Sequence, residues 1–296
     1  MLKSITKLAN EFGTDKGTQI AASHGYSLIY ELLFAPLRHL PRVDILEMGL
    51  ARGGPEVGGQ VNRKIAGAPS LDTWLSYFQN SHVVGFDISD FSEIRHERFT
   101  FFRGDSGRLE DVQQLRSIPF ATTNGETDEV ATRLFDIIID DASHASYHQQ
   151  LGLSVLFDSL KPGGIYVIED LGWQPESIER DLPSVPLTSD LLTRFSASGI
   201  FPTTAAIPAD AARMLEREIS CVCMFDESLL NAMGDSYNRR FNLPKVLRSG
   251  WRGKRGVIRM LDPYFWLYSV RRFRQSLVAT EFTNHQSVKL AILQRI

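Results

Sequence analysis

Acidic side chains and one histidine follow two buried apolar runs of the chain. Leu134–Ile139 leads into Asp140-Asp141-Ala-Ser-His144, and Ile165–Ile168 leads into Glu169-Asp170. If the two runs are neighbouring parallel strands, about 4.8 Å apart, their ends meet at the edge where open α/β sheets bind ligands. Up to four carboxylates and an imidazole would then share one small space. Because like charges at that distance repel, the pattern predicts a bound cation or a protonated carboxyl.

Oxygen donors of this kind favour a hard ion, Mg²⁺ or Mn²⁺. We predict Asp141, Glu169 and Asp170 as its ligands, whereas Asp140 either faces a cofactor or caps the following helix. His144 lies three residues after Asp141, in the loop that opens the next helix. Beside a metal it is a candidate general base, and otherwise it is a surface or packing residue.

Glycines follow the first predicted strand, Val43–Met48. The stretch Glu47-Met-Gly49-Leu-Ala51-Arg-Gly53-Gly54 lets the backbone turn tightly and approach a ligand. It is not the Gly-x-Gly-x-x-Gly pattern that brings a pyrophosphate to a helix N-terminus. A carboxylate at Glu47 would repel a pyrophosphate but would suit a cationic amine or sulfonium.

Polar residues also end the next two predicted strands. Asp87 ends His82–Asp87, where an acid hydrogen-bonds a ribose diol or caps a helix. Phe99–Arg103 is followed by Gly104-Asp105-Ser106, a turn that either contacts an adenine edge or has no ligand. Together with the glycine turn, these strand ends predict a ligand that carries adenosine without phosphate.

Strand and helix patterns alternate along the first half of the chain. The apolar strands are nearly continuous, which is typical of a parallel sheet buried on both faces. Repeated strand–helix–strand units predict an α/β fold with a doubly wound, mostly parallel Rossmann-like sheet. We expect a helical cap over residues 1–40, the core over residues 41–174, and an elaboration over residues 175–296. The final run, Ser287–Leu293, predicts a closing edge strand.

Besides a helix over Leu109–Leu115, helices are predicted in three longer segments. They cover Tyr26–Phe34, Ser70–Phe78 with Ser70 as the N-cap, and Tyr147–Leu160. His148 is expected on the surface of the last of these. Residues 55–69 form an insert after the glycine turn, which we expect to be a surface loop or a lid.

Taken together, the motifs resemble those of class I S-adenosylmethionine-dependent methyltransferases. Within that class the chain is similar to the metal-dependent macrocin- and mycinamicin-type sugar O-methyltransferases, whose relatives include the rhamnosyl O-methyltransferase and cephalosporin hydroxylase group. The resemblance covers about residues 10–173. Its most specific part is Asp140-Asp-Ala-Ser-His144 with Glu169-Asp170, and Gly13-Thr-Asp-Lys-Gly-Thr18 and Val84-Gly-Phe-Asp87 also match.

The resemblance implies S-adenosylmethionine as methyl donor, a divalent ion on the three predicted ligands, and His144 as the base beside Asp141. The acceptor would be a sugar hydroxyl in a glycosylated natural product or a glycan, whose reactivity a chelating metal raises as a Lewis acid. The resemblance also implies that the elaboration over residues 175–296 shapes the acceptor pocket. Ala51 departs from the family pattern, which has a glycine there. The residues predicted to contact the cofactor are Glu47, Gly49, Ala51, Gly53, Asp87, Asp105, Ser106 and Asp140.

Charge is unevenly distributed along the chain. The net charge is −3, yet residues 238–275 hold eleven Lys or Arg and a single acid, Asp262. This basic segment has three interpretations: a solvated face, a site for an anionic or lipid-linked acceptor, or a membrane-surface helix over residues 262–273. Nucleic acid is not expected as a partner, because the total charge is negative and no recognised nucleic-acid motif is present.

Composition, 43 % hydrophobic and 23 % charged residues, is that of a globular protein. No run reaches the roughly 18 apolar residues of a membrane span, and no signal peptide is evident. Cys221 and Cys223 suggest neither a disulfide framework nor a zinc site, so we expect a cytoplasmic protein. The resemblance adds the expectation of a homo-oligomer. Two alternatives remain: a nicotinamide-dependent oxidoreductase, and a non-catalytic S-adenosylmethionine-binding protein.

Overall fold

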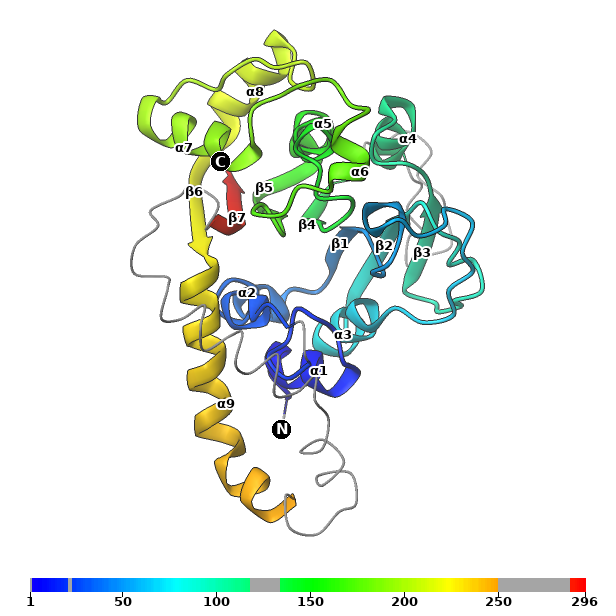
Figure 1. Ribbon diagram of the computed structural model, residues 1–296, viewed down its shortest axis with the longest axis vertical. Helices are drawn as coiled ribbons and strands as arrows, with labels where there is room; N and C mark the ends of the chain where they lie inside the picture. The colour runs from blue at the N-terminus through cyan, green and yellow to red at the C-terminus, as the bar shows by residue number, and fades with distance from the viewer. Residues whose placement is uncertain (1, 21–22, 118–133, 250–287) are drawn as a thin grey trace.

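A seven-stranded sheet forms the centre of the fold. The computed structural model describes residues 2–20, 23–117, 134–249 and 288–296. The strands lie in the order β3-β2-β1-β4-β5-β7-β6 (Figure 1). They are β1 (Val43–Met48), β2 (Ser81–Asp87), β3 (Phe99–Arg103), β4 (Phe135–Asp140), β5 (Leu160–Ile168), β6 (Ile219–Asp226) and β7 (Val288–Arg295). The first five are parallel, and β7 is antiparallel to both of its neighbours, so the predicted mostly parallel sheet is confirmed.

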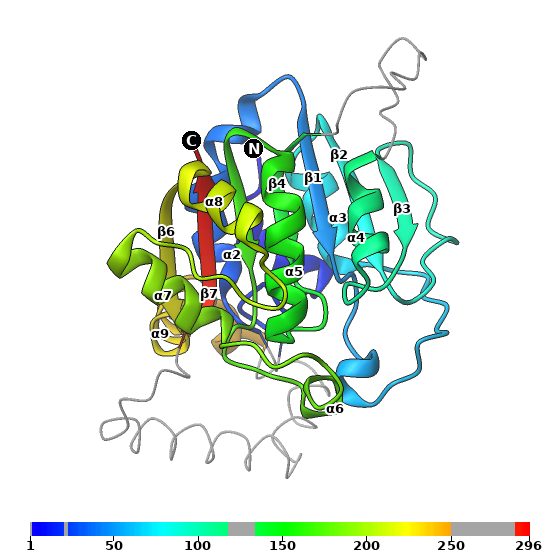
Figure 2. The ribbon, with the colours of Figure 1, turned by 90° about the horizontal axis from the view of Figure 1, so that it is seen from above.

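Helices cover both faces of the sheet (Figure 2). One face carries α1 (Ile5–Phe12), α2 (Tyr26–Phe34) and α3 (Pro69–Tyr77). The other carries α4 (Leu109–Gln114), α5 (Ser146–Leu156), α7 (Thr188–Ser198) and α8 (Ala209–Glu218). The remaining helical elements are α6 (Glu176–Glu179), α9 (Glu227–Ser249) and the short 3-10 turns η1 (Pro36–His39), η2 (Pro55–Val57), η3 (Leu115–Ser117) and η4 (Phe157–Ser159).

Alternate residues of each strand supply the two cores. In β1, Val43 and Ile45 pack toward α1–α3, while Leu46 and Met48 pack toward the α5 face. This alternation follows from the strand geometry, in which successive side chains point to opposite faces. It also decides to which side of the sheet each acid at a strand end points.

Two predicted helix boundaries are wrong. Ser70 is not the N-cap of α3: the cap is Ala68, which makes no side-chain bond, and Pro69 starts the helix. Proline suits a first helical position because its missing N–H has no intrahelical partner to lose there. The helix predicted to reach Leu160 ends at Leu156, because η4 follows and Leu160 already pairs with Phe135 as part of β5.

The final strand exists as predicted, but its predicted position at the edge is wrong. β7 lies between β5 and β6, and the edge is β6, which the sequence analysis did not identify as a strand. The four successive apolar residues 290–293 are all buried, which fits a strand covered on both faces. Cys221 and Cys223 lie exposed on β6.

Several predictions fall outside the described residues. The cationic side chains of the basic segment, from Arg239 to Arg274, are among these, so its three interpretations stay predictions. The division of the chain at residues 40 and 174 also stays a prediction. In the ranges that the structure covers, no helix combines the length and apolarity needed to cross a bilayer.

Candidate functional site

Gly49 brings the ends of β1 and β4 together. Its φ is +86°, and a Cβ there would lie 2.0 Å from the carbonyl oxygen of Asp141. The Asp141 N–H donates to the Met48 carbonyl at 2.8 Å, which joins the two strand ends beyond the last paired residues. Only glycine allows this backbone approach. The glycine turn, which was predicted to bind a cofactor, therefore also fixes the backbone of Asp141.

A cavity of about 550 Å³ opens over these strand ends. We call it the larger cavity. Residues of seven segments line it: the loop before α2, the turn after β1, the loops after β4 and β5, and the starts of α3, α9 and β7. The polar residues among them include Asp15, Lys16, His24, Arg52, Asp141, His144, Asp170, Glu227 and Lys289. Trp173 also lines the cavity, with its ring centroid 5.0 Å from that of His144.

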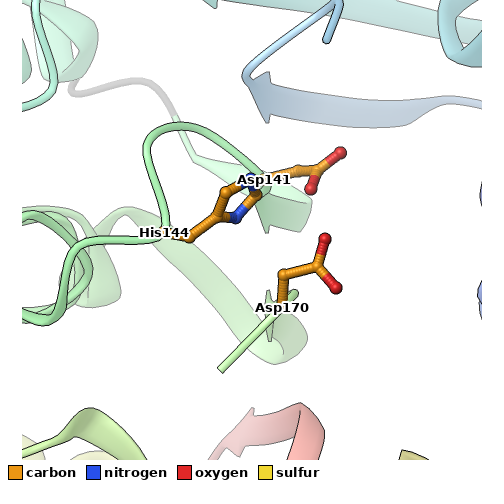
Figure 3. A group of neighbouring side chains, drawn as sticks. All are labelled: Asp141, His144 and Asp170. Carbon is orange, nitrogen blue, oxygen red and sulfur yellow. The ribbon is translucent and has the colours of Figure 1, made fainter. Parts of the chain in front are cut away.

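Asp141, His144 and Asp170 converge in the larger cavity. Each offers one ligand atom, and the three atoms lie within 4.8 Å of one another (Figure 3). Among the residues that the structure describes, His144 (φ 64°) and Asp170 (φ 54°) are the only ones other than glycine with positive φ. Such conformations cost about 1–3 kcal/mol each and are concentrated at functional sites. The Nδ1 atom of His144 is buried and has no hydrogen-bond partner among these residues.

Asp170 is surrounded by donors and cations. The Tyr26 hydroxyl donates to its Oδ1 at 2.6 Å, His24 Nε2 lies 3.7 Å from its Oδ2, and Lys289 Nζ lies 3.8 Å from its Oδ1. Burial raises the pKa of Asp170, but its interactions with His24, His144 and Lys289 and the hydrogen bond from Tyr26 outweigh burial and lower it. The carboxylate is therefore ionised near neutral pH.

Beneath the larger cavity, Lys16 places its ammonium among three acids. Its Nζ lies 2.5 Å from Asp141 Oδ2, 2.8 Å from Glu169 Oε1 and 3.8 Å from Glu47 Oε1. Burial lowers the pKa of Lys16, but the adjoining carboxylates raise it well above its ordinary value. Lys16 was not among the predicted site residues, although the motif Gly13–Thr18 that contains it is part of the resemblance.

Three predicted site residues line neither this cavity nor the one described next. Glu169 accepts from Lys16 and, at 2.5 Å, from the Tyr30 hydroxyl. Glu47 accepts from Ser70 at 3.0 Å, and burial raises its pKa to about 7 against the opposing effect of Lys16.

Asp140 is the third, and it points to the opposite, α5 face of the sheet. Burial raises its pKa to about 7. The N-cap of α5 is Ala145, so Asp140 does not cap that helix. Cofactor contact by Glu47 and Asp140, and metal binding by Glu169, stay predictions.

A smaller cavity, of about 270 Å³, adjoins the first. Asp87, Asp105 and Ser106 line it, together with Phe86 and the glycine turn, so the three strand ends predicted to bind a cofactor do meet. The Asp87 carboxylate accepts the Leu50 and Ser89 N–H groups at 2.8 and 2.7 Å. The residues that line both cavities are Gly49, Ala51, Glu56 and Ala142, which places the junction of the cavities at the turn after β1.

His148 belongs to the smaller cavity, so its predicted place on the helix surface is wrong. Its side chain is buried, and its Nδ1 lies 2.6 Å from the Ser143 hydroxyl and 3.4 Å from that of Ser106. The ring approaches so closely that a Cβ on Gly107 would lie 2.4 Å from it. The spacing failed here because α5 is covered on nearly all sides.

The insert 55–69 folds back on the glycine turn. Glu56 Oε1 accepts the N–H groups of Gly53 and Gly54 at 3.0 and 2.6 Å. Arg63 donates to the Ser89 hydroxyl at 3.1 Å. Both side chains line the smaller cavity, so the insert forms part of its wall.

Comparison with known proteins finds relatives of one kind. No protein-family model matches the chain. It is 37 % identical over 167 residues to the 8-demethyl-8-alpha-L-rhamnosyl tetracenomycin-C 2'-O-methyltransferase of Streptomyces olivaceus, covering 56 % of this chain and 37 % of that protein. It is 31 % identical over 201 residues to the demethylmacrocin O-methyltransferase of Streptomyces fradiae, covering 64 % and 43 %. The chain thus matches less than half the length of these relatives.

The fold is shared with a solved enzyme. The MycE methyltransferase of the mycinamycin biosynthetic pathway, whose structure contains Mg and SAH, superposes with a TM-score of 0.54 over 76 % of this chain and 53 % of that one, at 24 % identity. The fold is that of a class I methyltransferase. The sequence resemblance to sugar O-methyltransferases is confirmed by the matched relatives.

Proposed function

We propose that the protein is an S-adenosylmethionine-dependent, divalent-metal-assisted O-methyltransferase that acts on a sugar hydroxyl of a glycosylated natural product. The smaller cavity would take the adenosine of the methyl donor, and the larger cavity the acceptor. The named relatives support this assignment, since they methylate the rhamnosyl sugar of a tetracenomycin and demethylmacrocin. The MycE structure with Mg and SAH supports the choice of cofactor and ion.

One observation carries the proposal: two strained residues, His144 and Asp170, lie beside Asp141 in the larger cavity. Three polar side chains held so close together fit a divalent ion, because carboxylate oxygens are the donors that Mg²⁺ and Mn²⁺ prefer. Asp141 and Asp170 would hold this ion, with Glu169 as the third predicted ligand. Bound there, it would act as a Lewis acid on the acceptor hydroxyl.

The side chains around this position have separate tasks. His144 would take the proton of the acceptor hydroxyl while the methyl group is transferred, because it lines the larger cavity beside Asp141 and Asp170. The Tyr26 hydrogen bond orients Asp170, and the charge of Lys289 favours its ionised form. The shared wall at Gly49 and Ala142 would hold donor and acceptor in contact, which supplies much of the rate of a bimolecular reaction.

The nicotinamide-dependent alternative is disfavoured by Glu56. Its carboxylate already accepts the two backbone N–H groups of the glycine turn. Those donors are the kind that binds a pyrophosphate in dinucleotide-binding folds. A dinucleotide phosphate would meet a negative charge there instead of free donors.

The acceptor remains a class rather than a compound. We infer a glycosylated macrolide or related natural product, because the relatives act on such molecules. A lipid-linked or anionic acceptor, peripheral membrane contact, a homo-oligomer and a cytoplasmic location stay predictions.

Calorimetry with S-adenosylhomocysteine, with and without Mg²⁺, tests the proposal. We expect micromolar binding of the cofactor product, and Mg²⁺ binding that is lost in Asp141→Ala. The matched control is Asp210→Ala, which removes a carboxylate whose side chain is 93 % exposed on α8 and should leave both affinities unchanged. Binding of NAD in place of S-adenosylhomocysteine would refute the assignment.

The role of His144 can be separated from that of the ligands. With a panel of glycosylated macrolides and labelled S-adenosylmethionine, His144→Ala should lose methyl transfer but keep Mg²⁺ binding. A parallel loss of Mg²⁺ affinity would instead make His144 a metal ligand. Full activity in the variant would refute its role as base.

A further inference from the structure

Lys16 is the least exposed cation of the site, and the proposed reaction has no task for it. Its side chain is 2 % exposed, and its Nζ lies within 4 Å of the acidic side chains of Asp141, Glu169 and Glu47. Burying an ammonium costs several kcal/mol unless well-placed partners offset it. Packing alone does not explain why a lysine, rather than an apolar side chain, is buried beneath Asp141 and Glu169.

Lys16 donates to only one of the two oxygens of each partner carboxylate. Asp141 uses Oδ2 and Glu169 uses Oε1 to accept from the ammonium. Within the described part of the chain, no hydrogen bond reaches the other oxygen of either carboxylate. One ammonium thus fixes the orientation of two acids from adjacent strands and leaves one oxygen of each unused.

The backbone of Lys16 is itself held in place. The Lys16 carbonyl accepts the Ser27 N–H at 2.8 Å, at the start of α2. Two residues further, the Thr18 N–H donates to Asn10 Oδ1 of α1 at 2.7 Å. The loop therefore connects the helices of the N-terminal segment to the acids at the strand ends, and Lys16 is rigid at both ends.

We propose that Lys16 is a positioning residue that orients Asp141 and Glu169 for metal binding, which makes the segment before α2 part of the active site. The inference rests on the proposed function, because it assumes that these acids bind a divalent ion. Residues that orient metal ligands through hydrogen bonds typically change metal affinity when they are removed.

A neighbouring lysine makes the role testable. Lys289 lies 3.8 Å from Asp170 and also lines the larger cavity, but no described contact joins it to Asp141 or Glu169. If lysines near the site acted only through charge, removing either one would relieve repulsion of a cation and tighten metal binding. A positioning role predicts the opposite sign for Lys16.

The experiment titrates Mn²⁺ into wild-type protein, Lys16→Met and Lys289→Met, and follows free Mn²⁺ by electron paramagnetic resonance. We expect Mn²⁺ to bind about 10- to 100-fold more weakly to Lys16→Met. Lys289→Met should bind it slightly more tightly than wild type. S-adenosylhomocysteine affinity, measured by calorimetry, should be unchanged in Lys16→Met, because Lys16 does not line the smaller cavity.

Each outcome is decisive. Unchanged or tighter Mn²⁺ binding in Lys16→Met would overturn the positioning role while leaving the proposed function intact. Failure of the wild-type protein to bind either Mn²⁺ or S-adenosylhomocysteine would overturn the proposed function itself. If Lys16→Met does not fold, Lys16→Gln decides, because it keeps a polar donor at the buried position but is uncharged and one bond shorter than the lysine that holds both acids. A several-fold loss of Mn²⁺ affinity there supports the role, and an unchanged affinity overturns it.

Discussion

Replacing Gly49 with alanine should separate the two strand ends on which both proposed binding sites depend. A Cβ at Gly49 would lie 2.0 Å from the carbonyl oxygen of Asp141, where ordinary contact begins near 3.4 Å. The backbone must therefore move apart by about 1.4 Å, which strains the hydrogen bond between Asp141 and Met48. Positive φ costs an alanine roughly 1–2 kcal/mol, and the overpacking adds roughly 1–3 kcal/mol.

Gly163 provides the matched control. It also has positive φ, +77°, but a Cβ there would meet nothing within 4 Å. Gly163→Ala should lose only the conformational part, roughly 1–2 kcal/mol, and should bind S-adenosylhomocysteine normally. Gly49→Ala should be less stable than this control in thermal denaturation and should bind the cofactor product too weakly to measure. Equal stability of the two variants, with normal binding in both, would refute the close-approach argument.

Three further variants test other parts of the site. Trp173→Ala should raise the KM for the acceptor about tenfold and leave that for S-adenosylmethionine unchanged, because the ring lies beside His144 in the larger cavity; equal effects on both would contradict this. Glu56→Gln should lower the free energy of unfolding by about 1–2 kcal/mol, as followed in urea, because a neutral amide oxygen accepts more weakly from Gly53 and Gly54; unchanged stability counts against it. Asp140 has a folded pKa of about 7, above the roughly 3.9 of an unfolded chain, so its contribution to stability is present at pH 4 and is lost as pH rises through 7. Asp140→Asn should therefore be more stable than wild type at pH 8 but not at pH 4. Urea denaturation at the two pH values measures this, and the opposite order would contradict the raised pKa of Asp140.

The parallel strands were predictable because their apolar runs are long and are punctuated by turns. β1 and β3 have the predicted bounds, and the ends of the others differ by a few residues. β6 was missed because it is half exposed and its cysteines and mixed side chains give no strong pattern. The position of β7 depended on that missing neighbour, which no local pattern reveals.

The candidate site was predictable in its composition and only in part in its geometry. The acids at the ends of β4 and β5 could be found from their spacing, because parallel strands bring their ends to one edge. Which way each acid points depends on its parity along the strand, and this turns Glu169 toward α2. Lys16 could not be found this way, since it lies 125 residues from Asp141 in the sequence and only the fold joins them.

The place of β7 between β5 and β6 constrains the order in which the chain can assemble. Among the described strands, β6 pairs with β7 alone, and β7 begins 62 residues after β6 ends. During synthesis the first five strands can pair as they emerge. Residues 219–226 are made before β7, so their backbone N–H and C=O groups lack that partner strand until β7 is synthesised. Until residues 288–295 are made, β5 is a temporary border of the sheet, and a nascent chain stalled in this interval would be prone to aggregation.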